Sequence, residues 1–133
     1  MSTHHLNGKV YFVNLKIAPE HIRFRITEDE FSMLMEHGTL SNATSFGSLC
    51  LYYGIRTHNA ATNREGHILE LNAHSGEGDT RYMLTVFTDG IARLKSGNAA
   101  KDGIQEHLAF DNGDLLSIGL EIDLHSKKGS DKS

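Results

Sequence analysis

The sequence predicts a single α+β domain in which one principal helix packs on one face of a mostly antiparallel sheet of five to seven strands. Three observations predict this fold class. Apolar and polar residues alternate in two short runs between residues 13 and 26, which is typical of a β-hairpin. The period then changes to 3.6 residues over residues 28–37, as in an amphipathic helix. The longest strict alternation in the chain, over residues 116–124, predicts a half-buried strand of an antiparallel sheet.

The two short runs form a hairpin whose turn contains Pro19. Proline at the second position of a four-residue turn fixes φ near the value of a type I turn. The resulting register places Ile17 opposite Ile22 and Lys16 opposite Arg23. One face of this hairpin is therefore apolar and the other is basic.

The helix that follows the hairpin has a start signal and a stop signal. Thr27 and Glu30 have the spacing of a capping box, in which each side chain bonds the backbone N–H of the other residue. Gly38 is placed to end the helix in the left-handed conformation. The helical stripe that faces the sheet consists of Phe31, Leu34 and Met35.

The rest of the chain predicts further strands, joined by polar segments. Residues 41–48 are expected to form a polar connection and residues 58–66 a loop. The sequence does not decide the secondary structure of residues 91–103, because Gly97 and Asn98 would soon interrupt a helical turn there. No internal repeat and no linker between domains is evident. The further strands are expected over residues 49–55, 69–73, 82–86 and 116–124.

Composition narrows the class of protein. A chain of 133 residues suits one domain with its own core, expected over residues 13–124, with an N-terminal segment over residues 1–12 and a disordered tail over residues 125–133. A net charge of −4 argues against nucleic acid as the main partner. The lone Cys50 allows no internal disulfide. Since no run resembles a signal peptide or a membrane span, we expect a cytoplasmic protein without a membrane partner.

Part of the pattern resembles an uncharacterised family of small bacterial proteins. The resemblance covers about the first third of the chain and has a faint echo over residues 119–123. It implies a bacterial, cytoplasmic origin and an α+β fold, and it implies no activity and no catalytic residue. The residues that carry it are Leu15-Lys16-Ile17, Ile22-Arg23-Phe24-Arg25-Ile26-Thr27, Glu30, Leu34, Gly38 and Phe46-Gly47.

The basic face of the hairpin is the first candidate site. Lys16, Arg23 and Arg25 could bind an anion or an acidic protein, because arginine forks suit carboxylates and phosphates. The like charges of Lys16 and Arg23 lie opposite each other, which is unfavourable unless a negative group is near. In the alternative reading the cations form a surface ladder with acids of their own sheet. The candidate acids are Glu70, Glu121 and Asp123.

Histidines offer a second candidate. If Met1 is removed, the amine, two amides and the His4 imidazole would form a square-planar site for Cu(II) or Ni(II). The alternative is that His4 is incidental in an N-terminal tail. No other spacing of histidines suits a metal, and the sequence predicts no cofactor.

No catalytic constellation is evident, so no catalytic residue is predicted. Glu106 is a candidate buried acid, because its strand points it inward in the row of Ile104 and Leu108. A carboxyl group there could act as a general acid or base, or it could lie at the solvent end of the strand. Apolar residues on the opposite strand faces suggest a second layer or a homo-oligomer interface. They are Tyr52, Met83 and Phe87.

These observations favour a non-enzymatic binding or accessory module that contacts another protein or an anionic ligand through the basic hairpin face. The alternative is a small enzyme or metal-binding protein whose site is assembled from dispersed residues. That alternative requires at least two members of one set to converge in a pocket. The set is His58, His67, His74, His107 and Glu106.

Overall fold

The computed structural model describes residues 4–6, 9–96 and 103–123. The predicted tail, residues 125–133, lies outside the described residues, as do residues 97–102. The elements in chain order are β1 (His4–Leu6), β2 (Lys9–Tyr11), β3 (Asn14–Ala18), β4 (His21–Thr27), α1 (Glu28–His37), β5 (Thr39–Phe46), β6 (Leu49–Thr57), β7 (Leu69–Gly76), β8 (Asp79–Val86), α2 (Thr88–Lys95), β9 (Ile104–Ala109) and β10 (Leu115–Asp123).

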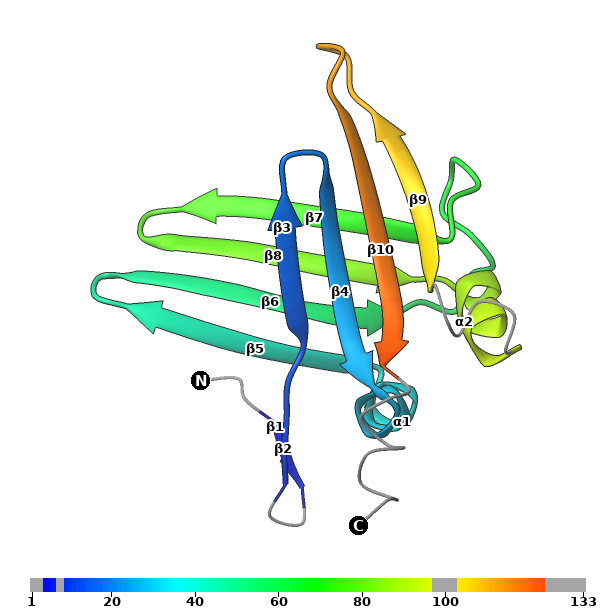
Figure 1. Ribbon diagram of the computed structural model, residues 1–133, viewed down its shortest axis with the longest axis horizontal. Helices are drawn as coiled ribbons and strands as arrows, with labels where there is room; N and C mark the ends of the chain where they lie inside the picture. Colours follow the sequence, from blue (N-terminus) through cyan, green and yellow to red (C-terminus); the bar gives the residue numbers. More distant parts are fainter. Residues whose placement is uncertain (1–3, 7–8, 97–102, 124–133) are drawn as a thin grey trace.

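Two four-stranded sheets pack face to face and form the body of the molecule (Figure 1). The front sheet has the strand order β3-β4-β10-β9, and the back sheet has the order β5-β6-β8-β7. Their strands run crosswise, as in an orthogonal β-sandwich (Figure 1). A separate small pair, β1 and β2, precedes the front sheet. The core lies between the sheets and includes the fully buried Phe24, Leu34, Leu84 and Leu120.

The α+β class with one main helix is confirmed, but the expectation of one sheet of five to seven strands is wrong. Alternation along a strand shows which face is buried and does not show what covers that face. Here the apolar faces of the two sheets cover each other, and α1 packs beside them against β4, β5, β6 and β10. Among the described residues, neither helix has the length and apolar character needed to cross a membrane.

The predicted register of the first hairpin and the predicted ends of the helix are confirmed. Ile17 pairs with Ile22 in the antiparallel register of β3 and β4. The Thr27 Oγ1 accepts a hydrogen bond from the Glu30 amide at 3.1 Å, and Glu30 accepts one from the Thr27 amide at 2.8 Å. Gly38 adopts φ 80°, the left-handed conformation that ends the helix. These features depend on residues close in sequence, which is why the sequence predicts them. The buried side of α1 differs from the predicted stripe, because Met33 is buried with Leu34, whereas Phe31 and Met35 are half-buried.

One segment differs from its prediction, and the structure decides another that the sequence left undecided. Residues 41–48 form most of β5 and the following turn, although they were expected to form a connection. Their polar side chains are tolerated because β5 is an edge strand and its second half is exposed. Residues 88–95 form the helix α2, in which Leu94 is buried. Burial of Leu94 in the core stabilises a helix that its own sequence supports weakly.

Strand β10 also departs from the expected antiparallel arrangement. It pairs antiparallel with β9 but parallel with β4. A second parallel pair, β6 and β8, holds the back sheet together. The other pairs of the two sheets are antiparallel. The parallel pair places the acidic end of β10 beside the arginines of β4, a contact between segments far apart in the sequence.

The two halves of the chain repeat one topology, although no repeat was predicted. Read as β7-β8-β6-β5, the back sheet reproduces the order β3-β4-β10-β9, with antiparallel, parallel and antiparallel pairs in the same places. Each helix connects one sheet to the other (Figure 1). The strand pairings therefore give each position in one sheet a corresponding position in the other. For example, a row of four paired residues in the front sheet corresponds to a row of four in the back sheet: Leu15, Phe24, Leu120 and Ile104 to Leu71, Leu84, Ile55 and Leu40.

Candidate functional site

The arginines of the basic hairpin face are paired with acids of their own sheet. Arg23 lies 3.6 Å from Glu121, and Arg25 lies 3.4 Å from both Glu121 and Asp123. The parallel pairing of β10 with β4 produces this ladder of surface charges. Lys16, opposite Arg23 on the edge strand β3, is exposed and forms no ion pair within the described part of the chain.

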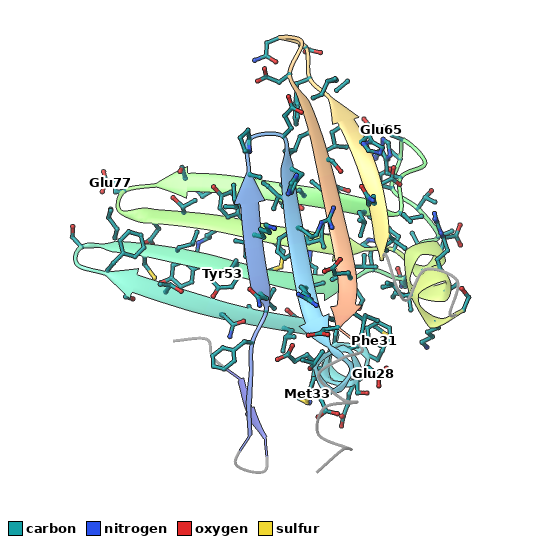
Figure 2. The ribbon with its side chains drawn as sticks, viewed as in Figure 1. Glu28, Phe31, Met33, Tyr53, Glu65 and Glu77 are labelled. Carbon is teal, nitrogen blue, oxygen red and sulfur yellow. The ribbon has the colours of Figure 1, made fainter. Side chains whose placement is uncertain are left out.

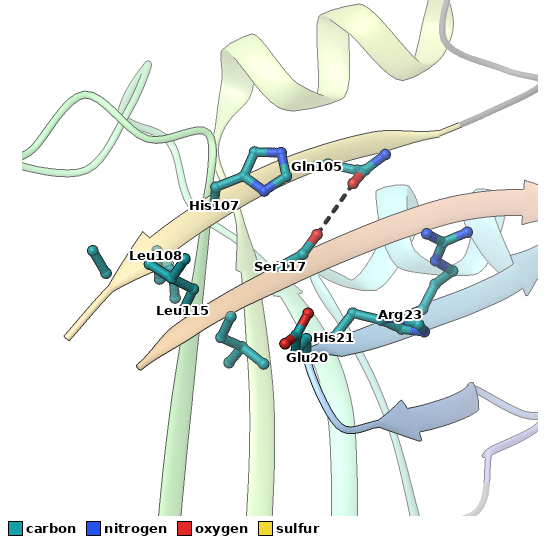
Figure 3. Close-up of a pocket in the computed structure, with 10 residues that line it drawn as sticks. Glu20, His21, Arg23, Gln105, His107, Leu108, Leu115 and Ser117 are labelled. Carbon is teal, nitrogen blue, oxygen red and sulfur yellow. Dashed lines mark hydrogen bonds between the residues drawn. The ribbon is translucent and has the colours of Figure 1, made fainter. Parts of the chain in front are cut away.

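A shallow trough crosses the outer face of the front sheet above β10 (Figure 3). Its volume is about 490 Å³. Two rows of side chains define this β10 trough. In one row Ser117 lies between His21 and His107, and in the next Gly119 lies between Arg23 and Gln105. Gly119 contributes no side chain to the second row, so Arg23 and Gln105 are the side chains of that row that line the trough.

Two side chains of the β10 trough, Arg23 and Gln105, offer hydrogen-bond donors to a ligand. The Ser117 hydroxyl donates to Gln105 Oε1 at 3.1 Å, so the Gln105 NH₂ is left as a donor (Figure 3). The Arg23 guanidinium has five N–H groups. Its ion pair with Glu121 occupies few of them, so the others can donate to a ligand. The His21 and His107 rings lie at the two sides. Among the residues that line the trough, Glu20 carries the negative charge.

At the matching place on the back sheet, two side chains stack on each other. There Tyr52 lies between Arg81 and Ala43, the positions that correspond to Ser117, His21 and His107. The Arg81 guanidinium stacks over the Tyr52 ring at 4.1 Å, a cation–π contact. The same topology therefore carries a stacked pair of side chains at this place on one sheet and the β10 trough on the other.

The environment of Tyr52 also changes its titration. A hydrogen bond to the Cys50 side chain is the largest cause that raises the pKa of Tyr52 above 10.0, and the negative charge of Asp79 adds to it. The folded protein therefore holds this proton more tightly than the unfolded chain does, so the folded state loses stability as the pH rises above 10.0. In an alkaline absorbance titration, we expect Tyr52→Phe to remove a late-titrating phenol. A variant that leaves the late part of the curve unchanged would contradict this assignment.

Glu106 is half-buried and joins the two sheets at a corner. Its Oε1 lies 2.7 Å from His67 Nδ1, and its Oε2 accepts a hydrogen bond from the Ile68 amide at 2.6 Å. A corner cavity of about 580 Å³ opens beside this pair, between β7 and β9. Glu65, which also lines it, projects from the loop next to β9 (Figure 2). The other lining residues are Asn63, His67, Leu69, Glu70, Leu71, His107, Leu108, Ala109 and Phe110.

The contact with Glu106 sets the hydrogen-bonding state of the His67 ring. A carboxylate only accepts hydrogen bonds, so Nδ1 carries the hydrogen in this pair. Nε2 of a neutral ring is then an acceptor. Within the described part of the chain no group occupies that nitrogen, which belongs to a residue that lines the corner cavity. The arrangement can accept a proton from a molecule in the cavity.

The matching position on the back sheet indicates what this corner needs for folding. Asn42 occupies the row position that corresponds to Glu106 and is 2% exposed. Its Oδ1 accepts a hydrogen bond from the Val13 amide at 2.6 Å, much as Glu106 accepts from Ile68. A neutral side-chain amide is therefore enough to accept a hydrogen bond from such a backbone N–H group. Folding at this corner does not by itself require the negative charge of Glu106 or its contact with His67.

The remaining candidates lie apart from both sites. His4 belongs to β1, and the residues before it lie outside the described residues. His58 packs against Phe87, which is buried, and Tyr52 and Met83 are half-buried in the back sheet. In the described ranges no three His, Cys, Asp or Glu side chains form a group that could hold a metal.

Most residues of the β10 trough were not predicted from the sequence. The alternation along each strand shows only that His21, Gln105, His107 and Ser117 lie on polar faces of their strands. It does not show that β10 lies between β4 and β9, and only that order brings the four side chains together. Compared with family models, with curated proteins and with solved structures, the chain has no match, so any assignment of function rests on the geometry of these two sites.

Proposed function

We propose that this protein is a non-enzymatic binding module and that the β10 trough binds an anionic group, such as a carboxylate or phosphate, of a small molecule or of another protein. One observation carries the proposal. Arg23 and Gln105 line one trough from the two strands beside β10, next to the row of His21, Ser117 and His107, and both can donate hydrogen bonds into it. Hydrogen bonds from charged donors to anions are short and strong, and an arginine fork suits a planar carboxylate.

This proposal moves the binding site from the hairpin to the strands beside it. Arg25 forms ion pairs with two acids, Glu121 and Asp123, so fewer of its N–H groups are available to a ligand. Lys16 is free to bind but does not line the trough. Arg23 remains because its ion pair with Glu121, the one it makes within the described residues, is long at 3.6 Å, and because Gln105 across β10 also offers a donor. On the back sheet, Arg81 and Tyr52 stack at the corresponding positions, which supports the idea that the fold does not require the side chains found in the β10 trough.

Titration of the labelled protein with acetate and with inorganic phosphate, followed by amide NMR, tests the proposal. We expect the largest shifts at Arg23, Ser117 and Gly119. Arg23→Gln should weaken binding roughly tenfold or more, because a hydrogen bond from a charged group contributes about 1.5–3 kcal/mol. Lys16→Gln, a cation removed from the same face outside the trough, should bind as the natural protein does. Equal effects of the two variants, or shifts elsewhere, would refute the site.

A second candidate function rests on the pair of His67 and Glu106. At least two residues of the dispersed set converge at a cavity, as an enzyme would require, and His107 lines the same cavity. A carboxylate that fixes a histidine and leaves its second nitrogen open is the arrangement of many general bases. Nitrogen NMR of the imidazole decides whether it could act so. A ring with its hydrogen on Nε2 would remove this candidate.

A further inference from the structure

We infer that the anionic ligand of the β10 trough is an amphipathic carboxylate, a small molecule with a carboxylate head and an unbranched apolar chain. The inference rests on the proposed function and adds the class of ligand. The head would lie at Arg23 and Gln105, and the chain would run along the start of β10 toward the turns that join β3 to β4 and β9 to β10.

A second cavity continues the trough in that direction. It has a volume of about 980 Å³ and lies between the two turns. It shares Glu20, Leu115 and Leu116 with the trough, so the two cavities adjoin. Pro19 lines it from the first turn and Phe110 from the second. A ligand bound at Arg23 can therefore extend into this notch without leaving the surface.

The adjoining surface is apolar where a chain would lie. Leu115 is 70% exposed and is the most exposed large hydrophobic residue described. It lies opposite Ala109 on the outer face, two residues before Ser117 and therefore about 7 Å from it along the strand. Phe110 is about half exposed, at 49%. Covering these side chains with a hydrocarbon chain would remove apolar surface from water.

Charge determines which way the ligand lies. Glu20, Asp111 and Asp114 line the notch, whereas Arg23 lies at the far end of the trough. A carboxylate in the notch would face these acids, so the head is directed to Arg23 and only an uncharged arm enters the notch. The site thus has hydrogen-bond donors at one end, exposed apolar side chains next to them, and acids at the other end. A carboxylate with an apolar chain fits this order of groups.

Binding of octanoate, measured beside acetate, tests the inference. Each buried methylene contributes about 0.8 kcal/mol, so a few of them should make octanoate bind at least about tenfold more tightly than acetate. Leu115→Ser should abolish this advantage and leave acetate binding unchanged. Leu49→Ser, at a leucine 49% exposed on the other sheet, is the matched control and should keep the advantage. Glu20→Gln should strengthen the binding of both anions.

The outcomes separate the inference from the proposed function. If acetate shifts the trough and octanoate binds no more tightly, the inference is wrong and the anion site stands. If octylamine binds as well as octanoate, the site does not select a carboxylate head and the inference fails. It also fails if Leu49→Ser and Leu115→Ser have the same effect, because the apolar chain is then not bound at Leu115. If neither acetate nor phosphate binds at Arg23, the proposed function itself is wrong.

Discussion

Replacing Gly54 by alanine will lower the free energy of unfolding by about 3 kcal/mol, because the back sheet has no space for the added methyl group. A Cβ atom at Gly54 would lie 2.6 Å from the carbonyl oxygen of Leu40 and 2.7 Å from Ser41 Cβ. Two of the three closest atoms belong to the backbone of the paired strand β5, so they cannot move aside without disturbing the sheet. Urea denaturation of the natural protein and the variant measures the loss.

Gly119→Ala is the matched control for this prediction, because Gly119 holds the corresponding row position in the front sheet. Its nearest atoms would lie 3.3 and 3.5 Å from the added Cβ, and the closer one is the Ile104 carbonyl oxygen. We expect a loss below about 1 kcal/mol. We also expect a weaker affinity for acetate, because the methyl group would lie between Arg23 and Gln105, which line the β10 trough. Similar losses of stability in both variants would contradict the explanation from packing.

Replacing Glu106 by alanine should lower the free energy of unfolding by about 2–3 kcal/mol, because a partly buried donor loses its acceptor. Both carboxylate oxygens are used: one contacts His67 at 2.7 Å and the other accepts from the Ile68 amide at 2.6 Å. Glu106→Gln should cost about 1 kcal/mol, because an amide oxygen can still accept from Ile68. Equilibrium denaturation of both variants gives the two values.

The difference between the two Glu106 variants separates a structural role from a chemical one. If Glu106→Gln is stable, it provides a folded protein in which His67 has lost its carboxylate partner, and the imidazole NMR signals should change. Glu70→Gln alters an acid that lines the same cavity without a hydrogen bond to His67, and it should change neither stability nor those signals. A stable Glu106→Ala variant would show that the corner does not depend on this carboxylate.

The fold could be predicted wherever neighbours in the sequence decide it. The turn at Pro19, the register of Ile17 with Ile22 and the cap at Thr27 depend on residues within a few positions of one another. Strand β5 could not be predicted in this way, because its polar residues lie on an exposed edge. Helix α2 is stabilised by burial of Leu94 rather than by its own propensity.

The repeat of the two halves stayed hidden for a related reason. The matched positions share an apolar character and seldom an identity. Phe24, Ile26, Phe31 and Leu34 correspond in spacing to Leu84, Val86, Ile91 and Leu94. Such spacing is common to many unrelated hairpins followed by a helix, so it does not by itself indicate a repeat. The strand orders of the two sheets make the correspondence clear.

The sequence by itself determined the α+β class, the first hairpin and the ends of the helix after it, and the face on which Arg23 lies. The tertiary structure alone decided that two sheets cover each other, that β10 lies between β4 and β9, and that His67 meets Glu106. The physical reason is the range of the interactions. Capping, turn geometry and alternation act between near neighbours, whereas strand order and the meeting of side chains at a site depend on burial of the whole apolar surface at once.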